Sequence, residues 1–207
     1  MMADLTLYTN PMSRGRIARW MMEEVGEPYE TVVLEYGTTM KSPDYLAVNP
    51  MGKVPAVRHG DVVVTEAAAI CAYLADAFPA AGLAPPHGSP LRAPYYRWMF
   101  FAAGPVEAAV TNKSQGFESD KKAMLGYGSF EDMVDGLEHA LVGGPYICGD
   151  QFTAADVYVG SQIMWGLMFK TMPERPSFLD YAGRLRERPA GVRAAEFDDA
   201  LIPKQEG

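Results

Sequence analysis

The chain contains a turn rich in proline and glycine that leads directly into a predicted strand, Asn49-Pro50-Met51-Gly52-Lys53-Val54-Pro55-Ala56-Val57. An X-Pro bond tolerates the cis form far better than any other peptide bond. A cis bond before Pro55 would turn the Val54 backbone outward and leave its N–H and C=O without strand partners. Such groups can pair with an extended, peptide-like ligand as an added strand does. The alternative interpretation is an ordinary proline at the start of an edge strand.

Around this turn, residues 4–78 alternate short extended runs with helical ones, the pattern of an α/β layer structure. Strands are predicted at 5–8, 31–34, 55–58 and 62–65, and helices at 13–25, 42–48 and 66–78. The run 31–34 is apolar almost throughout, which predicts a strand buried on both faces. His59-Gly60-Asp61 has the length of a hairpin turn, so the last two strands should pair antiparallel in a βαβαββα order.

The second half of the chain has a different period. Six of the twelve residues from Pro79 to Pro90 are proline or glycine, which predicts a linker. Beyond it, 92–110, 121–141, 153–170 and 177–188 have helical patterns, and we find no convincing strand. Thr153 and Asp156 have the spacing of a capping box at one helix start. The expected domains are an α/β domain at 3–79 and an all-α domain at 89–207.

Composition excludes several classes of protein. The 207 residues carry a formal net charge of −8, which repels phosphate backbones and makes nucleic acid an unlikely partner. No apolar run predicts a membrane span or an export signal, so we expect a cytoplasmic protein without a membrane partner. Cys71 and Cys148 are far apart and lack a CxxC or histidine motif, so neither a metal site nor a dithiol redox site is expected.

Two further places could hold a ligand. Thr65-Glu66 precedes a predicted helix, where free amides favour a carboxylate and Glu66 can receive an ammonium group; alternatively, Glu66 only complements the helix dipole. At the end of the first strand, Ser13 offers a hydroxyl near a helix start, beside Arg14. A hydroxyl and a helix N-terminus can together stabilise a thiolate, although Ser13 could also be an ordinary N-cap.

Taken together, these stretches resemble the glutathione S-transferase family, in its bacterial cytosolic type. The motifs that carry the resemblance are Tyr-x-x-Pro-x-Ser-Arg at 8–14, Asn-Pro-x-Gly-Lys-Val-Pro at 49–55, Thr-Glu at 65–66 and Gly-Asp-x-Phe-Thr-x-Ala-Asp at 149–156. The resemblance covers nearly the whole chain. It implies a thioredoxin-like domain followed by an all-helical one, a homodimer, a role in detoxification, and glutathione as co-substrate without a metal.

The resemblance also implies roles for single residues. Val54 would pair with the cysteinyl backbone of glutathione, and Pro55 would be cis. Lys53 would lie near the glycyl carboxylate, with Arg14 also in the glutathione-binding set. Glu66 would contact the γ-glutamyl end. Many members have a serine after this acidic residue, but here the position is Ala67, so only its backbone amide can serve.

The residue that activates the thiol is the least determined part of the prediction. The family uses a tyrosine, serine or cysteine in the first loop. This chain has no cysteine before Cys71 and offers the polar side chains of Tyr8, Thr9, Asn10 and Ser13. Ser13 is our first candidate, because it combines a hydroxyl with a predicted helix start. Tyr8 is the second.

For an apolar electrophile, the expected pocket comprises Met12, Tyr36, Tyr96, Phe100, Trp165 and Phe169, although such side chains at helical spacing can equally belong to a core. The predicted function is a glutathione S-transferase that lets the glutathione thiolate attack hydrophobic electrophiles. One alternative is a glutathione-dependent disulfide reductase or peroxidase, with Asn10 or Thr9 polarising the sulfur. Another is a non-catalytic binding protein of the same fold, which the alanine at position 67 keeps open.

Overall fold

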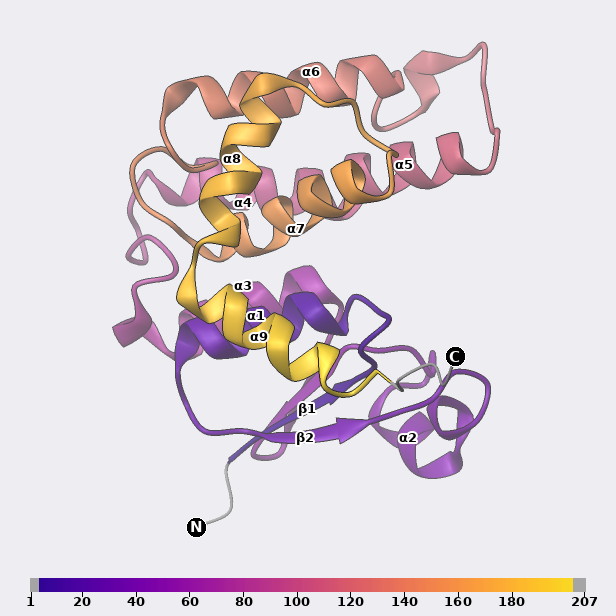
Figure 1. Cartoon of the computed structure of the whole chain (residues 1–207), viewed down its shortest axis with the longest axis vertical. Coiled ribbons are helices and arrows are strands. Elements are labelled where there is room, and N and C mark those ends of the chain that lie inside the picture. The colour runs from indigo at the N-terminus through magenta and orange to yellow at the C-terminus, as the bar shows by residue number, and fades with distance from the viewer. Residues whose placement is uncertain (1–3, 203–207) are drawn as a thin grey trace. The chain divides into compact units, whose positions relative to one another are not determined.

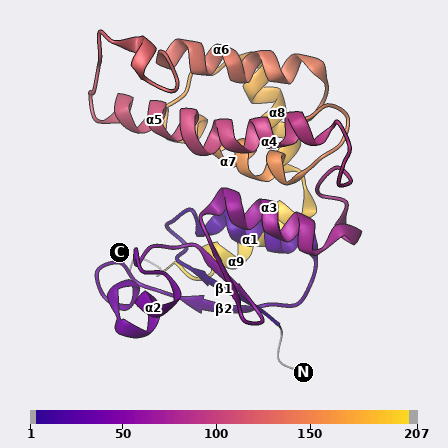
Figure 2. The same cartoon turned by 180° about the vertical axis from the view of Figure 1, so that it is seen from behind.

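A computed structural model describes residues 4–202 of the chain (Figures 1 and 2). These residues form two compact units. The first unit holds the described residues up to Ala81 together with those from Glu187 onward, and the second is Gly82–Arg186. Within the described part of the chain, no helix is long and apolar enough to cross a membrane.

The first unit is built on a mixed sheet. Among residues 4–202, four strands pair in the order β2-β1-β3-β4, with bounds β1 Leu5–Thr9, β2 Glu30–Val33, β3 Ala56–His59 and β4 Val62–Thr65. Strand β1 runs parallel to β2 and antiparallel to β3, and β3 and β4 form the predicted antiparallel hairpin. The predicted βαβαββα order is therefore confirmed, and the unit is a thioredoxin-like domain.

Helices cover both faces of this sheet. Helices α1 (Gly15–Val25) and α3 (Ala67–Ala77) lie on one side, and α2 (Pro43–Val48) lies on the other (Figures 1 and 2). Leu7 and Tyr8 follow each other on β1 and therefore point to opposite faces. Helix α1 ends at Gly26, whose φ of 78° is the left-handed conformation that glycine adopts without a steric penalty.

The prediction that residues 31–34 form a strand buried on both faces was wrong. Every residue of β2 is exposed in the described chain, and Val33 keeps 42% of its surface accessible. The reason is its position: β2 is an edge strand that pairs with β1 alone. Leu34, directly after the strand, is buried, and it belongs to a small cluster that also contains Met40 and Tyr45.

The last helix was not predicted. Helix α9 (Pro189–Asp199) begins with a proline at its first turn and packs against α1 in the first unit. The predicted second domain ran from 89 to 207, but the described residues from 187 onward belong to the first unit. Residue 3, where the predicted first domain starts, and residues 203–207, at the end of the predicted second domain, lie outside the described residues.

The second unit consists of helices, as predicted. Its longer members are α4 (Arg92–Phe101), α5 (Glu107–Ser114), α6 (Phe130–Ala140), α7 (Ala154–Met168) and α8 (Pro176–Arg186). A single turn of π-helix at Ala102–Val106 joins α4 to α5, so the predicted helix at 92–110 is one interrupted rod. The predicted helix at 121–141 starts later, because Ser129 caps α6 with Asp132.

The capping box at α7 is confirmed, and it does more than cap a helix. Asp156 is fully buried, and its carboxylate accepts hydrogen bonds from the Thr153 backbone N–H at 2.8 Å and the Thr153 hydroxyl at 3.1 Å. It also accepts from the Ile147 N–H at 2.7 Å and the Tyr181 hydroxyl at 2.8 Å. Burial raises the pKa of Asp156, and these four donors oppose the rise. One carboxylate thus joins the loop before α7 to helix α8.

Candidate functional site

The register of the sheet brings the predicted site segments to one end. Tyr8 near the end of β1 lies opposite Ala56 at the start of β3, and Ala56 lies opposite Thr65 at the end of β4. Neighbouring strands lie about 4.8 Å apart. The loop after β1, the Val54-Pro55 turn before β3 and Glu66 after β4 therefore leave the sheet side by side.

The Val54-Pro55 turn has the predicted geometry. The peptide bond between the two residues is cis. Within residues 4–202, neither the N–H nor the C=O of Val54 forms a hydrogen bond, and the residue is only partly buried. These are the backbone groups that an extended ligand needs in order to add as a strand.

Two side chains that the sequence analysis did not single out stabilise the turn by donating hydrogen bonds to its Lys53 C=O. The Tyr45 hydroxyl donates to the Lys53 C=O at 2.6 Å, and Asn49 Nδ2 donates to the same oxygen at 2.8 Å. Gly52 has a φ of 57°, and a Cβ there would lie 2.5 Å from the Met40 carbonyl oxygen. Asn49 belongs to the quoted motif, but the direction of Tyr45 depends on how α2 packs, for which the sequence has no local signal.

Glu66 has an unusual backbone. Its φ of 68° is in the left-handed region that side chains other than glycine rarely adopt. The carboxylate is exposed, and the residue is the N-cap of α3. The first backbone N–H groups of a helix have no acceptor within the helix, so Ala67 presents such an amide beside the carboxylate. The structure thus combines a negative side chain and a helix N-terminus at this point.

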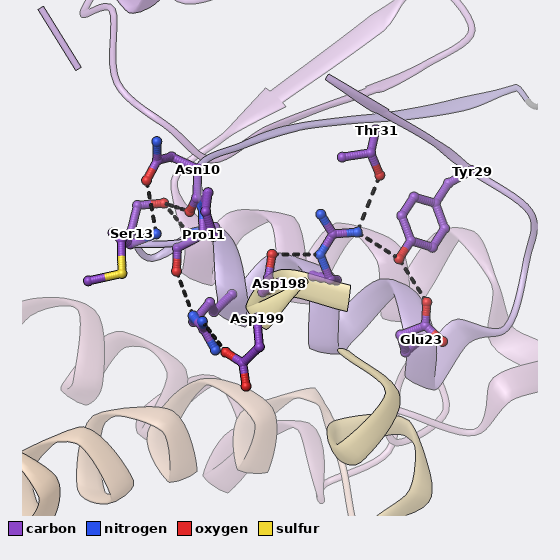
Figure 3. A network of polar contacts seen from close by, with 12 residues as sticks. Asn10, Pro11, Ser13, Glu23, Tyr29, Thr31, Asp198 and Asp199 are labelled. Atoms are coloured by element: carbon purple, nitrogen blue, oxygen red, sulfur yellow. Dashed lines mark hydrogen bonds and ion pairs between the residues drawn. The ribbon is translucent and has the colours of Figure 1, made fainter. Parts of the chain in front are cut away.

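The loop after β1 holds Ser13 in a tight turn (Figure 3). Its hydroxyl donates to the Asn10 C=O at 2.7 Å and accepts from the Gly15 N–H at 2.9 Å. The N-cap residue of α1 is Arg14, so Ser13 lies one residue before the cap and is not the ordinary N-cap that the alternative interpretation expected. Gly15 is required here, because a Cβ at this position would lie 2.0 Å from Thr9 Oγ1. Ser13 is therefore partly exposed, with its hydroxyl at the positive end of α1.

The other polar candidates of this loop are engaged or buried. Asn10 Nδ2 donates to the Leu34 C=O at 2.7 Å, and Asn10 Oδ1 accepts from the Met12 N–H at 2.9 Å. Thr9 is fully buried, and its hydroxyl has no partner among the described residues. Arg14 is exposed.

Tyr8 lies apart from Ser13. It is buried in a cluster with Leu34, Met40, Tyr45 and Ala56, and the ring centroids of Tyr8 and Tyr45 are 5.6 Å apart. This places its ring on the α2 side of the sheet. Strand alternation alone left the direction of this ring open, and in the structure the ring packs within this cluster.

The residues predicted to hold an apolar electrophile lie in both units. Met12 and Tyr36 in the first unit are 71% and 61% exposed, and the Tyr36 hydroxyl donates to the Met12 C=O at 3.3 Å. In the second unit the predicted residues are exposed, or partly buried in the case of Trp165: Tyr96, Phe100, Trp165 and Phe169. None of these six side chains is buried in the core of its own unit.

The two cysteine side chains are fully or partly buried. Cys71 is fully buried, which raises the pKa of its thiol, and burial raises the pKa of Cys148 to about 12. Neither thiol forms a disulfide. No three His, Cys, Asp or Glu residues between 4 and 202 gather as metal ligands do.

Comparison with known proteins identifies the family. Residues 3–76 match the glutathione S-transferase N-terminal domain, and residues 107–194 match the glutathione S-transferase C-terminal domain. The glutathione S-transferase GstA of Escherichia coli O157:H7 is 31% identical over 160 residues, which cover 76% of this chain and 77% of that protein. The chain belongs to the glutathione S-transferase family.

Solved structures of this family have the same fold. A glutathione transferase from Methylococcus capsulatus is 30% identical, with a TM-score of 0.80, and the likeness covers 96% of this chain and 100% of that one. A sphingomonad glutathione S-transferase complexed with glutathione is 28% identical, with a TM-score of 0.76 over 94% of this chain and 98% of that one. The transferase fold thus carries the site segments described above.

Proposed function

We propose that this glutathione S-transferase family member binds glutathione along the Val54 edge and lets its thiolate attack an apolar electrophile. The observation that carries the proposal is the cis Val54-Pro55 turn, which leaves both Val54 backbone groups without partners among the described residues. The cysteinyl part of glutathione is a short extended peptide, and it can exchange two hydrogen bonds with Val54. Family members complexed with glutathione support this choice of ligand.

The charged ends of glutathione match the groups on either side of Val54. The γ-glutamyl end carries an ammonium group and a carboxylate, which suit the exposed Glu66 carboxylate and the Ala67 amide. The exposed Lys53 ammonium suits the glycyl carboxylate at the other end. In this proposal the serine hydroxyl common at the Ala67 position is replaced by the backbone amide alone.

Ser13 is the proposed activating residue. Its hydroxyl donates to the Asn10 C=O, and rotation about the Cβ–Oγ bond redirects the same proton toward a bound sulfur. The N-terminus of α1 adds a partial positive charge that favours the thiolate over the thiol. The thiolate then forms a C–S bond with the electrophile, the leaving group departs with its electron pair, and the thiol proton is released to solvent.

A glutathione titration of the Ser13→Ala variant tests this assignment. Ultraviolet absorbance of the thiolate, followed from pH 5 to 9, gives the pKa of the bound thiol. One hydrogen bond to a charged group contributes about 1.5–3 kcal/mol, so its loss should raise that pKa by about 1–2 units. The conjugation rate near neutral pH should fall about 10- to 100-fold.

Ser114→Ala is the matched control for this experiment. The Ser114 hydroxyl donates to the Thr111 C=O at 2.7 Å, the same distance and the same three-residue spacing as the bond from Ser13 to Asn10. We expect this variant to behave as the wild type does. An unchanged thiol pKa in Ser13→Ala would refute the role of Ser13, and no glutathione binding at millimolar concentration would refute the proposal as a whole. Peroxide turnover that exceeded conjugation would select the reductase alternative.

The electrophile pocket and the homodimer are proposals of the same kind. Tyr96 and Phe100 lie one helical turn apart on α4, and Phe100 is 73% exposed. Either a bound apolar substrate or a second copy of the chain would bury these rings. Phe100→Ser distinguishes the two. If Phe100 lines a pocket, the variant should have a higher KM for the electrophile than the wild type. If Phe100 lies in a dimer interface, the variant should dissociate and have a lower molar mass by light scattering.

A further inference from the structure

The loop that carries Ser13 is tied to the far end of the chain through Arg16. Arg16 lies in the first turn of α1, and its Nε donates to the Pro11 C=O at 2.6 Å. Its Nη2 donates to Asp199 Oδ1 at 2.5 Å (Figure 3). A single guanidinium therefore bridges the loop after β1 and the last residue of α9.

Pro11 is at the centre of that loop. On one side, Asn10 is fixed to the end of β2 through its bond to the Leu34 C=O. On the other side, Ser13 bonds back to Asn10 and forward to Gly15. The Arg16 bond acts on the carbonyl between these two anchors. A shift of the Pro11 peptide would therefore move the turn that orients the Ser13 hydroxyl.

The end of α9 is itself fixed on α1 by a buried ion pair. Arg19 Nε donates to Asp198 Oδ1 at 2.8 Å, and both side chains are almost fully buried. Arg19 Nη1 also donates to the Tyr29 hydroxyl and to Thr31 Oγ1, at 3.3 and 3.2 Å (Figure 3). Because Asp199 follows Asp198 directly, the buried pair fixes the position from which Asp199 meets Arg16.

Burial and the neighbouring arginine charges shift the pKa of Asp198 in opposite directions. Burial raises the pKa of Asp198, while the guanidinium groups of Arg19 and Arg16 lower it and Asp199 raises it. The Arg16 side chain is 26% exposed and the Asp199 side chain is 64% exposed. An ion pair this open contributes little to stability by itself. Its effect should therefore appear in the geometry of the loop rather than in the folding free energy.

We propose that Arg16 is a positioning residue that sets the Ser13 turn through the Pro11 carbonyl, and that Asp199 of α9 holds Arg16 in place. This inference rests on the proposed role of Ser13. It assigns a part in the site to Asp199, which lies outside both segments that match the family domains.

Asp199→Asn separates positioning from a plain charge effect. If Arg16 and Asp199 acted on the thiolate only through their charges, removal of the Asp199 negative charge would lower the pKa of the bound thiol. Positioning predicts the opposite sign, because a loosened turn weakens the hydrogen bond from Ser13. We expect the thiol pKa to rise by about half a unit in Asp199→Asn and by more in Arg16→Gln.

Amide hydrogen exchange gives a readout that needs no catalysis. The Met12 N–H is bonded to Asn10 Oδ1 and the Gly15 N–H to Ser13 Oγ, so both amides report on the turn. We expect exchange at these two amides to accelerate about fivefold or more in Arg16→Gln and in Asp199→Asn. The mild Asp199→Asn change keeps the test valid should Arg16→Gln fail to fold.

Arg193→Gln is the matched control. Arg193 also joins α9 to α1, with its Nε 3.1 Å from Glu23 Oε2, but within residues 4–202 its hydrogen bonds go to Glu23 and not to the Ser13 loop. We expect this variant to leave the thiol pKa and both amides unchanged. If Arg16→Gln and Asp199→Asn behaved like Arg193→Gln, the positioning role would be refuted. If Ser13→Ala left the thiol pKa unchanged, the proposed role of Ser13 would fail instead, and amide exchange would still decide whether Arg16 orders the turn.

Discussion

Replacement of Asp156 by alanine should destabilise the helical unit strongly. The carboxylate accepts four hydrogen bonds, and its removal leaves the Ile147 N–H, the Thr153 N–H and the Tyr181 hydroxyl buried without an acceptor. Loss of a helix cap costs about 1 kcal/mol, and each buried group without a partner costs about 1–3 kcal/mol. The gain from no longer burying a charge offsets part of this sum. We expect a loss of about 3–5 kcal/mol in the free energy of unfolding.

The chain contains its own control for burial. Ser129 and Asp132 form the same capping box at α6, with Asp132 Oδ2 2.9 Å from the Ser129 N–H, but in solvent. Asp132→Ala removes the cap and leaves its former donors in contact with water. Its effect should therefore be several times smaller than that of Asp156→Ala.

Urea unfolding followed by tryptophan fluorescence measures both variants. In a Trp20→Phe background, the remaining tryptophans are Trp98 and Trp165, both in the second unit. With a slope of about 2 kcal/mol per molar urea, Asp156→Ala should lower the midpoint by about 2 M. Equal midpoint shifts for Asp132→Ala and Asp156→Ala would show that capping alone sets the cost, and would refute the argument from burial.

Three further outcomes are expected. Gly15→Ala places a Cβ 2.0 Å from Thr9 Oγ1, so it should cost about 1–3 kcal/mol of stability and raise KM for glutathione, which calorimetry and steady-state kinetics would show; wild-type values would contradict the close approach. Tyr45→Phe removes the 2.6 Å hydrogen bond to the Lys53 C=O, so the affinity for glutathione in a titration should fall. The pKa of the bound thiol, which we attribute to Ser13, should stay at its wild-type value. Unchanged affinity would mean that the turn needs no support from α2. The hydrogen bonds from Ser129 lower the pKa of Asp132 below 3.8, so its stabilising effect should be present above pH 4 and be lost as the pH falls through the lowered value. Acid unfolding curves of the wild type and Asp132→Ala that stayed parallel down to pH 2 would contradict this linkage.

Much of the fold could be predicted because its signals are local. The hairpin at 56–65, the end of α1 at Gly26 and the capping box at Thr153 each depend on residues a few positions apart. The turn at Val54-Pro55 differs from these: the dipeptide permits a cis bond, an ordinary edge-strand proline stayed open as the alternative, and the family resemblance implied the cis form.

The failures of prediction have a different origin. Whether 31–34 is a central or an edge strand depends on which strand pairs with it, and its apolar residues are the same in both cases. The direction of the Tyr8 ring depends on the face that α2 covers. Helix α9 was not predicted, because it begins with a proline and packs against α1, which is far away in the sequence.

The sequence by itself determined the order of the elements and the two-part organisation, because periodicity, capping and turn chemistry act over a few residues. Its motifs carried the resemblance to the family, and that resemblance implied the cis turn. Only the tertiary structure decided the direction of the Tyr8 ring, how Tyr45 supports Lys53, and that Asp199 meets Arg16 across 183 positions of sequence. No local pattern encodes such a contact. It follows from the packing of α9 on α1, where the buried pair of Arg19 and Asp198 fixes how the two helices meet.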